Sequence, residues 1–510
     1  MSALFLTEPL RRLERAALAA LPPGTLMARA AAAVADATSH LARGFARGRP
    51  VLALVGPGNN GGDALLAALL LRERGYACRA LALRAQAPSG GDAADAWRQA
   101  REAGLHIDGI DTLGPALAGA PIVIDGLFGI GLDRPLEGGA AALCDAIAQA
   151  ALPVVAVDVP SGIDADTGAV VGGQGGPAMR ARCTVTMITD KPGLHTGAAL
   201  DHAGTVMVAA LGLEDDRRAA TRPGDPGIGE LFTADRVAGA LPRRARDSNK
   251  GSFGTVLAYG GDAGMRGAVL LAARGAQVMG AGKVYVGTPA GDPFDAGQPQ
   301  LMSAPAEPDF AAYDAVAIGC GLGQSARARV RVAAALANAP AVVLDADALN
   351  LLAAEPALVD APRATPADAR RLMTPHPLEA ARLLGTDAGA VQVDRRGAAL
   401  ALARRYRMTV LLKGAGSIVA TPEGSWSIID AGSPALASAG TGDVLAGMIA
   451  ALLARGEAPA RAACVAAWLH GEAGARWEAR AGHAEGLSAA ELPRHVRAAL
   501  GARGAGTIAG

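Results

Sequence analysis

The sequence predicts an α/β protein with two domains, each built on a parallel sheet. Short apolar runs, typical of buried strands, alternate with longer helix-like runs along most of the 510 residues. This alternation favours parallel sheets covered by helices. The chain is too long for one ordinary hydrophobic core. Because no internal repeat is evident, we expect two different domains rather than a duplication.

The first series of apolar runs predicts five strands, with helix-like segments such as residues 92–103 and 140–151 between them. These strands are expected at residues 51–55, 78–83, 122–124, 154–157 and 184–188. A polar stretch rich in Gly and Pro then predicts a linker. We therefore expect a first domain at residues 1–213, a linker at 214–228 and a second domain at 229–505.

A second series of apolar runs follows the linker and predicts six more strands, in a part of the chain long enough for its own core. The strands are expected at residues 255–259, 283–286, 315–318, 342–344, 409–412 and 417–420. A strong helix-like run covers residues 444–455.

Composition and charge restrict the possible partners. Lys plus Arg and Asp plus Glu both number 48, so the net charge is zero and no basic surface for nucleic acid is expected. The apolar stretches are interrupted well short of a membrane span. The five cysteines are scattered without a CxxC pair, which indicates reduced, buried thiols in the cytoplasm. We expect small-molecule substrates, no nucleic-acid or membrane partner, and a homo-oligomer.

The segment GPGNNGGD, from Gly56 to Asp63, lies between a predicted strand and a predicted helix. This is the arrangement of a dinucleotide site, and the spacing of Gly56, Gly58 and Gly61 matches that pattern. Asp63 does not fit it, because its charge would compete with a pyrophosphate for the helix dipole. A nicotinamide dehydrogenase also needs an acidic residue after the next strand, where this chain has Arg84. A dehydrogenase is therefore disfavoured, and hydroxyl, amide or cation ligands suit the loop better.

Three of the predicted strands end in polar loops, and in a parallel sheet such ends lie along one edge. Asn60 follows the first strand, Asp125 ends the third, and Asp158 and Ser161 follow the fourth. Taken separately, each has an ordinary explanation as a turn or capping residue. Together, Asn60, Asp125 and Ser161 offer three hard oxygen ligands with one negative charge, which suits a monovalent cation. Asp158 is then the candidate for proton transfer.

The segments GPGNNGGD, IDGLFGIGLDRP and AVDVPSGIDADTG, in this order, resemble the NAD(P)H-hydrate epimerase family over roughly residues 10–212. That family has a Rossmann-like fold and interconverts the R and S hydrates of damaged nicotinamide cofactors. The resemblance implies potassium at Asn60, Asp125 and Ser161, and acid–base catalysis by Asp158. It also implies contacts with the hydrate at Asn59, Asn60, Gly61, Gly62, Asp63, Gly129, Ile130, Gly131, Leu132, Asp133, Arg134, Pro135 and Asp158.

In the second half, the pentapeptide AGTGD at residues 439–443 precedes the strong helix-like run. Glycines at a helix start leave backbone N–H groups free to bind an anion, and Thr441 can cap the helix. Asp443 beside such a site can accept a proton from a hydroxyl that attacks a terminal phosphate. The alternative is an ordinary aspartate in a first helical turn, which the dipole favours by about 0.3–1 kcal/mol.

Further strand-end loops in this half are glycine-rich or polar, namely GCGLG, LDADALN, MTPHPLE and LKGAGS. A lone histidine is more often structural, but His376 lies between two prolines that hold it rigidly, which suits contact with a substrate. Lys413 is either an ordinary surface residue or the start of a loop that wraps the phosphates of a nucleotide.

These motifs, with NKGSFGTVLAYGGDAGMRGA, resemble the ADP/ATP-dependent NAD(P)H-hydrate dehydratase family over roughly residues 229–500. That family has a ribokinase-like fold, phosphorylates the hydroxyl of the hydrate and eliminates phosphate, which restores NAD(P)H. The resemblance implies ADP as co-substrate and activation of the hydroxyl by Asp443. Phosphoryl transfer also leads us to expect Mg²⁺ bound with the nucleotide. It implies hydrate contacts at Ala268, Gly323, His376 and Asp443, and nucleotide contacts at Lys413, Gly414, Ala415, Gly416, Ser417 and Gly442.

The sequence thus predicts a bifunctional repair enzyme that epimerises the hydrate in one domain and dehydrates its S form in the other. Two alternatives stay open. The second half could be a ribokinase-like kinase of a small alcohol, because fold alone does not exclude it. The protein could also be a non-catalytic dinucleotide-binding scaffold, against which the intact set of Asn60, Asp125, Asp158 and Ser161 argues.

Overall fold

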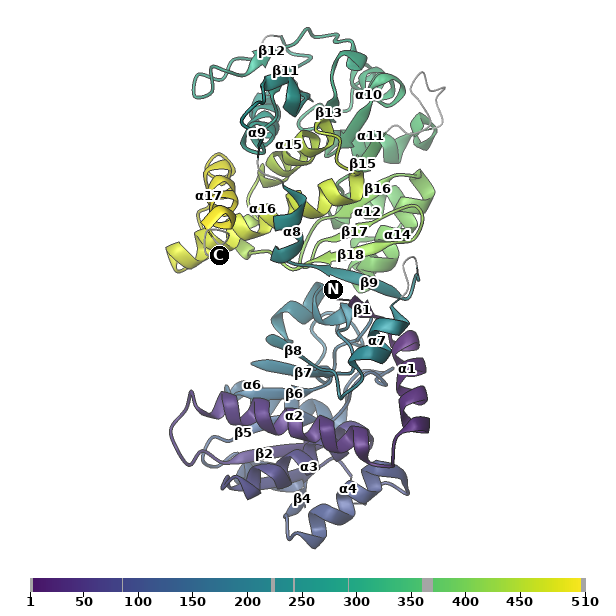
Figure 1. The fold of residues 1–510 in the computed structure, drawn as a ribbon, viewed down its shortest axis with the longest axis vertical. Helices are drawn as coiled ribbons and strands as arrows, with labels where there is room; N and C mark the ends of the chain where they lie inside the picture. The colour runs from purple at the N-terminus through teal and green to yellow at the C-terminus, as the bar shows by residue number, and fades with distance from the viewer. Residues whose placement is uncertain are drawn as a thin grey trace. The chain divides into compact units, whose positions relative to one another are not determined.

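The computed structural model describes residues 3–84, 86–221, 225–241, 244–291, 293–359 and 370–505 (Figure 1). Its internal contacts divide the chain into two compact units, Met1–Glu230 and Leu231–Gly510. Each unit contains a sheet with helices packed on it, so the expected α/β class is confirmed. The predicted linker contains a helix, α7 (Glu214–Ala220), and its residues 222–224 lie outside the described residues.

The first unit contains a seven-stranded sheet in the order β4-β3-β2-β5-β6-β7-β8, in which all neighbouring strands are parallel. Val55 pairs with Gly126, and Asp125 pairs with Ala156. The carboxyl ends of β2, β5 and β6 therefore lie side by side, as the sequence predicted. The strands are β2 (Val51–Val55), β3 (Cys78–Ala82), β4 (Ile107–Gly109), β5 (Ile122–Gly126), β6 (Val154–Val157), β7 (Cys183–Met187) and β8 (Thr205–Ala209).

Successive residues of these strands point to opposite faces of the sheet. Val51, Ala53 and Val55 pack in a core with α1, α2 and α3, whereas Leu52 and Leu54 pack in a core with α6. Figure 1 shows α2 running across the sheet. The helices are α1 (Thr7–Ala20), α2 (Thr25–Ala42), α3 (Asn59–Glu73), α4 (Gly91–Glu102), α5 (Leu113–Ala116) and α6 (Gly138–Gln149).

Strands β4 and β8 of the seven-stranded sheet were not predicted, and neither were two strands near the ends of the first unit. The latter two are β1 (Ala3–Phe5) and β9 (Ile228–Phe232), and they pair antiparallel with Ala3 opposite Glu230. Within the described part of the chain, no single helix is long and apolar enough to cross a membrane. Helices α1 and α2 meet the length and composition criteria only as a pair, and that pair is bent by 116°.

The second unit has the strand order β18-β17-β16-β15-β14-β13-β10-β11-β12. Neighbouring strands from β16 to β12 are parallel, and β16, β17 and β18 pair antiparallel. The strands are β10 (Thr255–Tyr259), β11 (Lys283–Gly287), β12 (Met302–Ser303), β13 (Ala315–Ile318), β14 (Ala341–Leu344), β15 (Arg370–Met373), β16 (Thr409–Leu412), β17 (Ile418–Ala420) and β18 (Trp426–Ile429).

Helices α9, α15 and α16 contribute to one large core on this sheet. The backbones of α9 and α15 come very close, because an added Cβ on Gly275 would overlap the Val444 carbonyl and one on Gly447 would overlap the Ala272 carbonyl. This close packing fixes the start of α15. The helices are α8 (Ala234–Ala240), α9 (Arg266–Val278), α10 (Ala326–Asn338), α11 (Asp347–Ala354), α12 (Pro377–Leu384), α13 (Ala388–Val393), α14 (Arg395–Tyr406), α15 (Thr441–Ala454), α16 (Pro459–Ala481) and α17 (Leu492–Ala505).

Candidate active sites

The first unit has a cavity of about 680 Å³ beyond the carboxyl ends of β2, β5 and β6. Most residues that the sequence predicted to contact the hydrate line this cavity, whereas Gly61, Gly62 and Pro135 do not. The predicted residues in the lining are Asn59, Asn60, Asp63, Gly129, Ile130, Gly131, Leu132, Asp133, Arg134 and Asp158. The structure therefore brings the three polar loops to one site.

The glycine-rich loop packs tightly against its neighbours. An added Cβ on Gly56 would overlap the carbonyl of Leu127, and one on Gly61 would overlap the carbonyl of Gly56. An added Cβ on Gly62 would lie 2.8 Å from Cε of Met27, whose side chain belongs to the cavity lining. Gly56 and Gly61 are required because backbone segments approach closely there. The polar side chains of the loop line the cavity.

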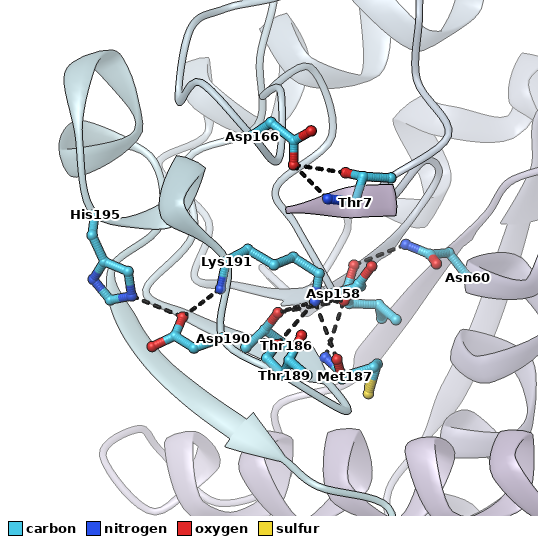
Figure 2. Close-up of polar contacts among 11 residues, drawn as sticks. Thr7, Asn60, Asp158, Asp166, Thr186, Met187, Thr189, Asp190, Lys191 and His195 are labelled. Atoms are coloured by element: carbon cyan, nitrogen blue, oxygen red, sulfur yellow. Dashed lines mark hydrogen bonds and ion pairs between the residues drawn. The ribbon is translucent and has the colours of Figure 1, made fainter. Parts of the chain in front are cut away.

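Asp158, directly after β6, is paired with a lysine that the sequence analysis did not identify. Lys191 Nζ lies 2.7 Å from Asp158 Oδ1, and Lys191 is only 1% exposed. Figure 2 shows the lysine side chain reaching Asp158 within a group of further acceptors. Nζ donates to Thr186 Oγ1 at 2.6 Å and to the carbonyl oxygens of Met187 and Thr189 at 3.1 and 3.2 Å. A buried ammonium group with these acceptors is held in one position.

The two carboxylate oxygens of Asp158 have different surroundings. Oδ1 accepts from Lys191, from the backbone N–H of Met187 at 3.0 Å and from the Thr186 hydroxyl at 3.4 Å. Among the described residues none donates to Oδ2, and Asp158 lines the cavity. The φ of Asp158 is 69°, a conformation that costs energy for a residue other than glycine, so its neighbours impose it. Oδ2 is thus the oxygen available to a bound molecule.

Helix α1 also contributes to the cavity, which the sequence analysis did not predict. The backbone N–H and hydroxyl of Thr7, its first residue, both donate to Asp166 Oδ1, at 2.7 and 2.9 Å. These bonds, drawn in Figure 2, attach the start of α1 to the loop that follows β6. The helix then brings Arg11 and Glu14 to the cavity wall. Burial raises the pKa of Glu14, and the charge of Asp158 raises it further.

Two of the three predicted potassium ligands are bound to each other at the end of β5. Asp125 is fully buried. Its Oδ1 accepts from the Ser161 hydroxyl at 2.7 Å, and its Oδ2 accepts from the Ser161 N–H at 2.9 Å. Burial raises the pKa of Asp125 to about 6, although hydrogen bonds from Ser161 and Leu127 act to lower it. Among the described residues, no cationic side chain forms an ion pair with this carboxylate.

A potassium ion fits this group of residues by the chemistry of their oxygen atoms. The Asp125 carboxylate, the Ser161 hydroxyl and the Phe128 carbonyl, which is 3.2 Å from Ser161 Oγ, are hard ligands. The amide of Asn60 is oriented by a 2.9 Å hydrogen bond from Nδ2 to the Val157 carbonyl. The observation that favours a cation is the buried carboxylate without a positive partner.

The second unit gathers charged residues at the carboxyl edge of its sheet. Asp345 follows β14, Lys413 follows β16, and Asp443 lies in the first turn of α15. Lys413 Nζ is 2.7 Å from Asp345 Oδ1 and 4.0 Å from Glu379 Oε2. The Thr374 hydroxyl donates to the same Asp345 oxygen at 2.8 Å. A lysine predicted to hold the nucleotide is therefore paired with an aspartate to which the sequence analysis gave no role.

Asp443 has the properties of a proton acceptor. Burial and the charge of Asp345 raise its pKa to about 6, although Cys320 and Lys413 act to lower it. An added Cβ on Gly442 would lie 3.3 Å from Lys413 Nζ, so the ammonium group faces the start of α15. Free N–H groups and a lysine at one place can bind a phosphate group. A carboxyl group with a pKa near 6 is well matched to proton transfer at neutral pH.

His376 is the N-cap of α12. Its Nδ1 accepts from the backbone N–H groups of Leu378 at 3.1 Å and Glu379 at 3.4 Å, and the Glu379 carboxylate accepts from the His376 N–H at 2.8 Å. These bonds form a capping box. Nε2 lies 3.5 Å from Glu379 Oε1, and the side chain is 46% exposed. His376 therefore has a structural role, and its side chain is partly exposed.

Arg395, which is fully buried, packs against the loop predicted to hold the nucleotide. Its Nη2 donates to the Lys413 carbonyl at 3.2 Å, and its Nη1 donates to Gln392 Oε1 at 2.7 Å. An added Cβ on Gly414 would lie 3.0 Å from both nitrogens. The guanidinium group thus packs directly against the backbone of the loop. Ser417 closes the loop with a 3.1 Å hydrogen bond to the Gly414 carbonyl.

The remaining predicted hydrate residues lie at the same edge. The backbone N–H of Gly323 donates to Asp347 Oδ2 at 2.8 Å, and an added Cβ on Gly321 would lie 3.2 Å from Ala268 Cβ. Cys320, Asp345 and Asp443 form the one group of at least three possible metal ligands among the described residues, with ligand atoms within 4.8 Å of one another.

Sequence reasoning missed Lys191, Asp345, Glu379 and Arg395. Asp345 and Glu379 lay inside strand-end loops that had already been singled out, so their signal was present. Lys191 follows β7 at the same sheet edge as Asp158, and that placement was the only available signal. Arg395 lies within a helix, where an arginine is common and gives no signal.

Known families match both parts of the chain. Residues 23–193 match the YjeF-related protein N-terminus, and residues 256–496 match NAD(P)H-hydrate dehydratase. The bifunctional NAD(P)H-hydrate repair enzyme Nnr of Coxiella burnetii is 36% identical over 98% of this chain and 99% of its own length. The enzyme of the same name from Escherichia coli is 35% identical, over 86% of this chain and 83% of its own.

Among solved structures, an ADP/ATP-dependent NAD(P)H-hydrate dehydratase from Bacillus subtilis, co-crystallised with ATP and Mg²⁺, is 32% identical. The match covers 54% of this chain and 99% of that one, with a TM-score of 0.46. The relatives matched over nearly their whole length are bifunctional. The chain therefore belongs to the family of bifunctional NAD(P)H-hydrate repair enzymes.

Proposed function

We propose that the first unit interconverts the R and S hydrates of NADH and NADPH, and that the second unit dehydrates the S hydrate while ADP is converted to AMP and phosphate. The observation that carries the proposal is the pair of sheet-edge sites, with Asp158 in the cavity of one unit and Asp443 at the start of α15 in the other. The two activities complement each other, because a stereospecific dehydratase leaves the other epimer unused.

Asp158 is the proposed proton-transfer residue of the epimerase. The hydroxyl of the hydrate lies on a ring carbon next to the ring nitrogen, so the nitrogen lone pair can expel it once it is protonated. Oδ2 of Asp158 is available on the cavity side, within reach of such a hydroxyl. Lys191 holds Oδ1 at 2.7 Å, which balances the charge of the carboxylate and fixes its direction.

Potassium is proposed at Asn60, Asp125 and Ser161. When bound, the ion would supply a fixed positive charge to the buried carboxylate of Asp125. Ser161 also accepts from the backbone N–H of Phe128 at 3.0 Å. An ion held by Ser161 would therefore help to fix residues 129–135, which are proposed to contact the hydrate.

In the second unit, Asp443 is proposed to take the proton of the hydrate hydroxyl while its oxygen attacks the terminal phosphate of ADP. The N–H groups at the start of α15 and the ammonium group of Lys413 would stabilise the transferred negative charge. The phosphate then leaves with the electron pair of the C–O bond. Loss of a proton from the neighbouring carbon restores the ring double bond.

The nucleotide is proposed to bind at residues 413–417 and Gly442. Mg²⁺ would supply further neutralisation of the phosphate charge, held mainly by the phosphates. The choice of ADP over ATP follows from the resemblance to the family, and parallel assays with each nucleotide would test it.

The main experiment supplies mixed R and S hydrates with ADP and Mg²⁺ and follows the absorbance of NADH. Wild type should convert both epimers. Asp158→Asn should recover NADH only from the S fraction, and Asp443→Ala should recover none while chromatography shows that epimerisation continues. Full recovery by Asp443→Ala, or a full epimerisation rate in Asp158→Asn, would contradict the assignments. A stable phosphorylated product would indicate a kinase instead.

We also propose that the epimerase comprises residues 1–213 and the dehydratase residues 229–505, and that the protein is a cytoplasmic homo-oligomer. The five cysteines without a disulfide support a reducing compartment. Separate expression of the two segments, followed by the two assays, tests the boundaries. Light scattering of the full chain tests the oligomer.

A further inference from the structure

Asp63 is a buried carboxyl group without a protein partner in the cavity of the first unit. It is 6% exposed and lines the cavity. Among the described residues, none donates a hydrogen bond to its side chain and no cation forms an ion pair with it. A polar group this buried normally has a partner. The direction left for such a partner is the cavity, where the hydrate is proposed to bind.

The position of Asp63 in α3 does not favour a negative charge. The helix begins at Asn59, so Asp63 lies beyond the first turn, and the free N–H groups at the helix start do little for it. Burial raises the pKa of Asp63 well above its usual value, and the carboxyl groups of Asp158, Glu14 and Asp92 raise it further. These surroundings favour the neutral carboxylic acid.

Asp158 lines the same cavity in the opposite situation. Its Oδ1 is bound by the Lys191 ammonium group and by the Met187 N–H, so its negative charge has partners. Two carboxyl groups in one site with environments this different are suited to different roles, one as acid and the other as base.

We propose that Asp63 is the second catalytic residue of the epimerase, a carboxylic acid that works with the Asp158 carboxylate across the bound hydrate. The inference rests on the proposed epimerisation. Asp63 comes from α3 and Asp158 from the end of β6, and both reach the cavity. The proposal places the nicotinamide ring between these two residues, with one carboxyl group toward each face.

Epimerisation requires a proton donor on one face of the ring and an acceptor on the other. Asp63 gives its proton to the hydroxyl, the C–O bond breaks with its electron pair going to oxygen, and water leaves while the nitrogen lone pair forms a C=N bond. Water then adds to the opposite face, the C=N electron pair returns to nitrogen, and Asp158 takes the released proton. The reverse reaction exchanges the roles of the two carboxyl groups.

A neutral Asp63 also removes the conflict found in the glycine-rich loop. A carboxylate beside the start of α3 would repel the pyrophosphate of a dinucleotide, whereas a carboxylic acid does not and can donate a hydrogen bond. The same residue can therefore admit the dinucleotide and supply the proton.

The test compares Asp63→Asn with wild type, using the full chain without nucleotide so that only epimerisation proceeds. Asparagine keeps the size and an N–H donor but cannot give up a proton. We expect kcat for epimerisation to fall by about 100-fold to 10,000-fold, with KM close to wild type. The control is Asp95→Asn, which removes a carboxylate from exposed α4, where it is ion-paired with Arg98. The control should keep the wild-type kcat.

Infrared spectroscopy of the free protein gives a readout that does not depend on activity. Wild type at neutral pH should show the C=O stretch of a protonated carboxylic acid, and Asp63→Asn should lack it. Circular dichroism verifies that the variant is folded, and Asp63→Ser serves as a second variant. A near-wild-type kcat in Asp63→Asn, or no such band in wild type, would overturn the inference. Wild type that does not epimerise at all would overturn the proposed function instead.

Discussion

Asp125→Asn tests whether the end of β5 is a cation site. Asparagine has nearly the shape of aspartate and accepts a hydrogen bond through Oδ1, but it carries no charge. Because Asp125 is fully buried, the substitution removes one uncompensated negative charge from the interior. It also replaces one of the two acceptor oxygens that bind Ser161 with an N–H₂ group. We expect opposite effects of the substitution in the absence and in the presence of potassium.

The magnitude follows from the pKa of Asp125, which burial raises from 3.8 to about 6. One pH unit corresponds to about 1.4 kcal/mol, so the ionised residue lowers stability by about 3 kcal/mol above pH 6. This penalty is absent below pH 3.8, where the group is protonated in both states, and it grows as the pH rises from there to about 6. Potassium at 100 times its Kd would stabilise wild type by about 2.7 kcal/mol.

The assay is hydrogen exchange of the β5 and β6 amides at pH 7.5, in potassium chloride and in choline chloride at equal ionic strength. In choline chloride, Asp125→Asn should be more stable than wild type by up to about 3 kcal/mol. In potassium chloride, wild type should gain stability and Asp125→Asn should not. Ser161→Ala, which keeps the carboxylate but loses the hydroxyl ligand, should respond weakly. Equal stabilisation of wild type and Asp125→Asn by potassium would refute the site.

Three further predictions concern the two units. Dehydration should slow as the pH falls through about 6, because Asp443 must be ionised to accept a proton, and a pH profile flat between 5 and 7 would contradict this. Gly56→Ala should destabilise the first unit by on the order of 3 kcal/mol, because its Cβ overlaps the Leu127 carbonyl. Gly58→Ala has open space and is the matched control in thermal unfolding. Arg395→Met should raise KM for ADP by loosening the loop at Lys413 while the epimerisation rate stays at the wild-type value, and an unchanged KM would exclude that role.

Most of the central strands were predictable from the sequence as apolar runs, whereas β1, β4, β8, β9, β12 and β18 were not predicted. Among the central strands, β15 (Arg370–Met373) was also missed, although it lies between β14 and β16. Two of its four residues are arginines, which are unusual in a buried strand. The structure accommodates them because Arg370 donates to the Leu453 carbonyl at 2.7 Å and Arg371 donates to the Leu336 carbonyl. These carbonyls lie near the ends of α15 and α10, where cations are favoured. These acceptors for the two arginines are brought to β15 only by the tertiary structure.

The positions of the sites were predictable to a similar extent. The polar loops after the predicted strands identified the sheet edge of each site, because the carboxyl ends of parallel strands lie along one edge. The charge state of each carboxyl group was not predictable, since it depends on burial and on partners distant in sequence. Lys191 reaches Asp158 from the loop after β7, and no local sequence pattern predicts that ion pair. Likewise, the surroundings of His376 suggested only rigidity, and its capping role required the coordinates.

The two units share an electrostatic arrangement that can be tested directly. In each, a lysine lies 2.7 Å from one aspartate, Lys191 from Asp158 and Lys413 from Asp345. In each, a second carboxyl group has a pKa raised first by burial and next by that paired aspartate, namely Asp63 and Asp443.

If the paired aspartate sets the pKa of its neighbour, Asp345→Asn should lower the pKa of Asp443, because a negative charge is removed while Lys413 remains. The acid limb of the dehydration profile should then move below pH 6, with the rate measured on the S hydrate and saturating ADP. Thr374→Val removes a hydrogen bond to Asp345 without changing its charge, and its acid limb should stay in place. An acid limb that stays in place or moves to higher pH in Asp345→Asn would show that the charge of Asp345 does not raise the pKa of Asp443.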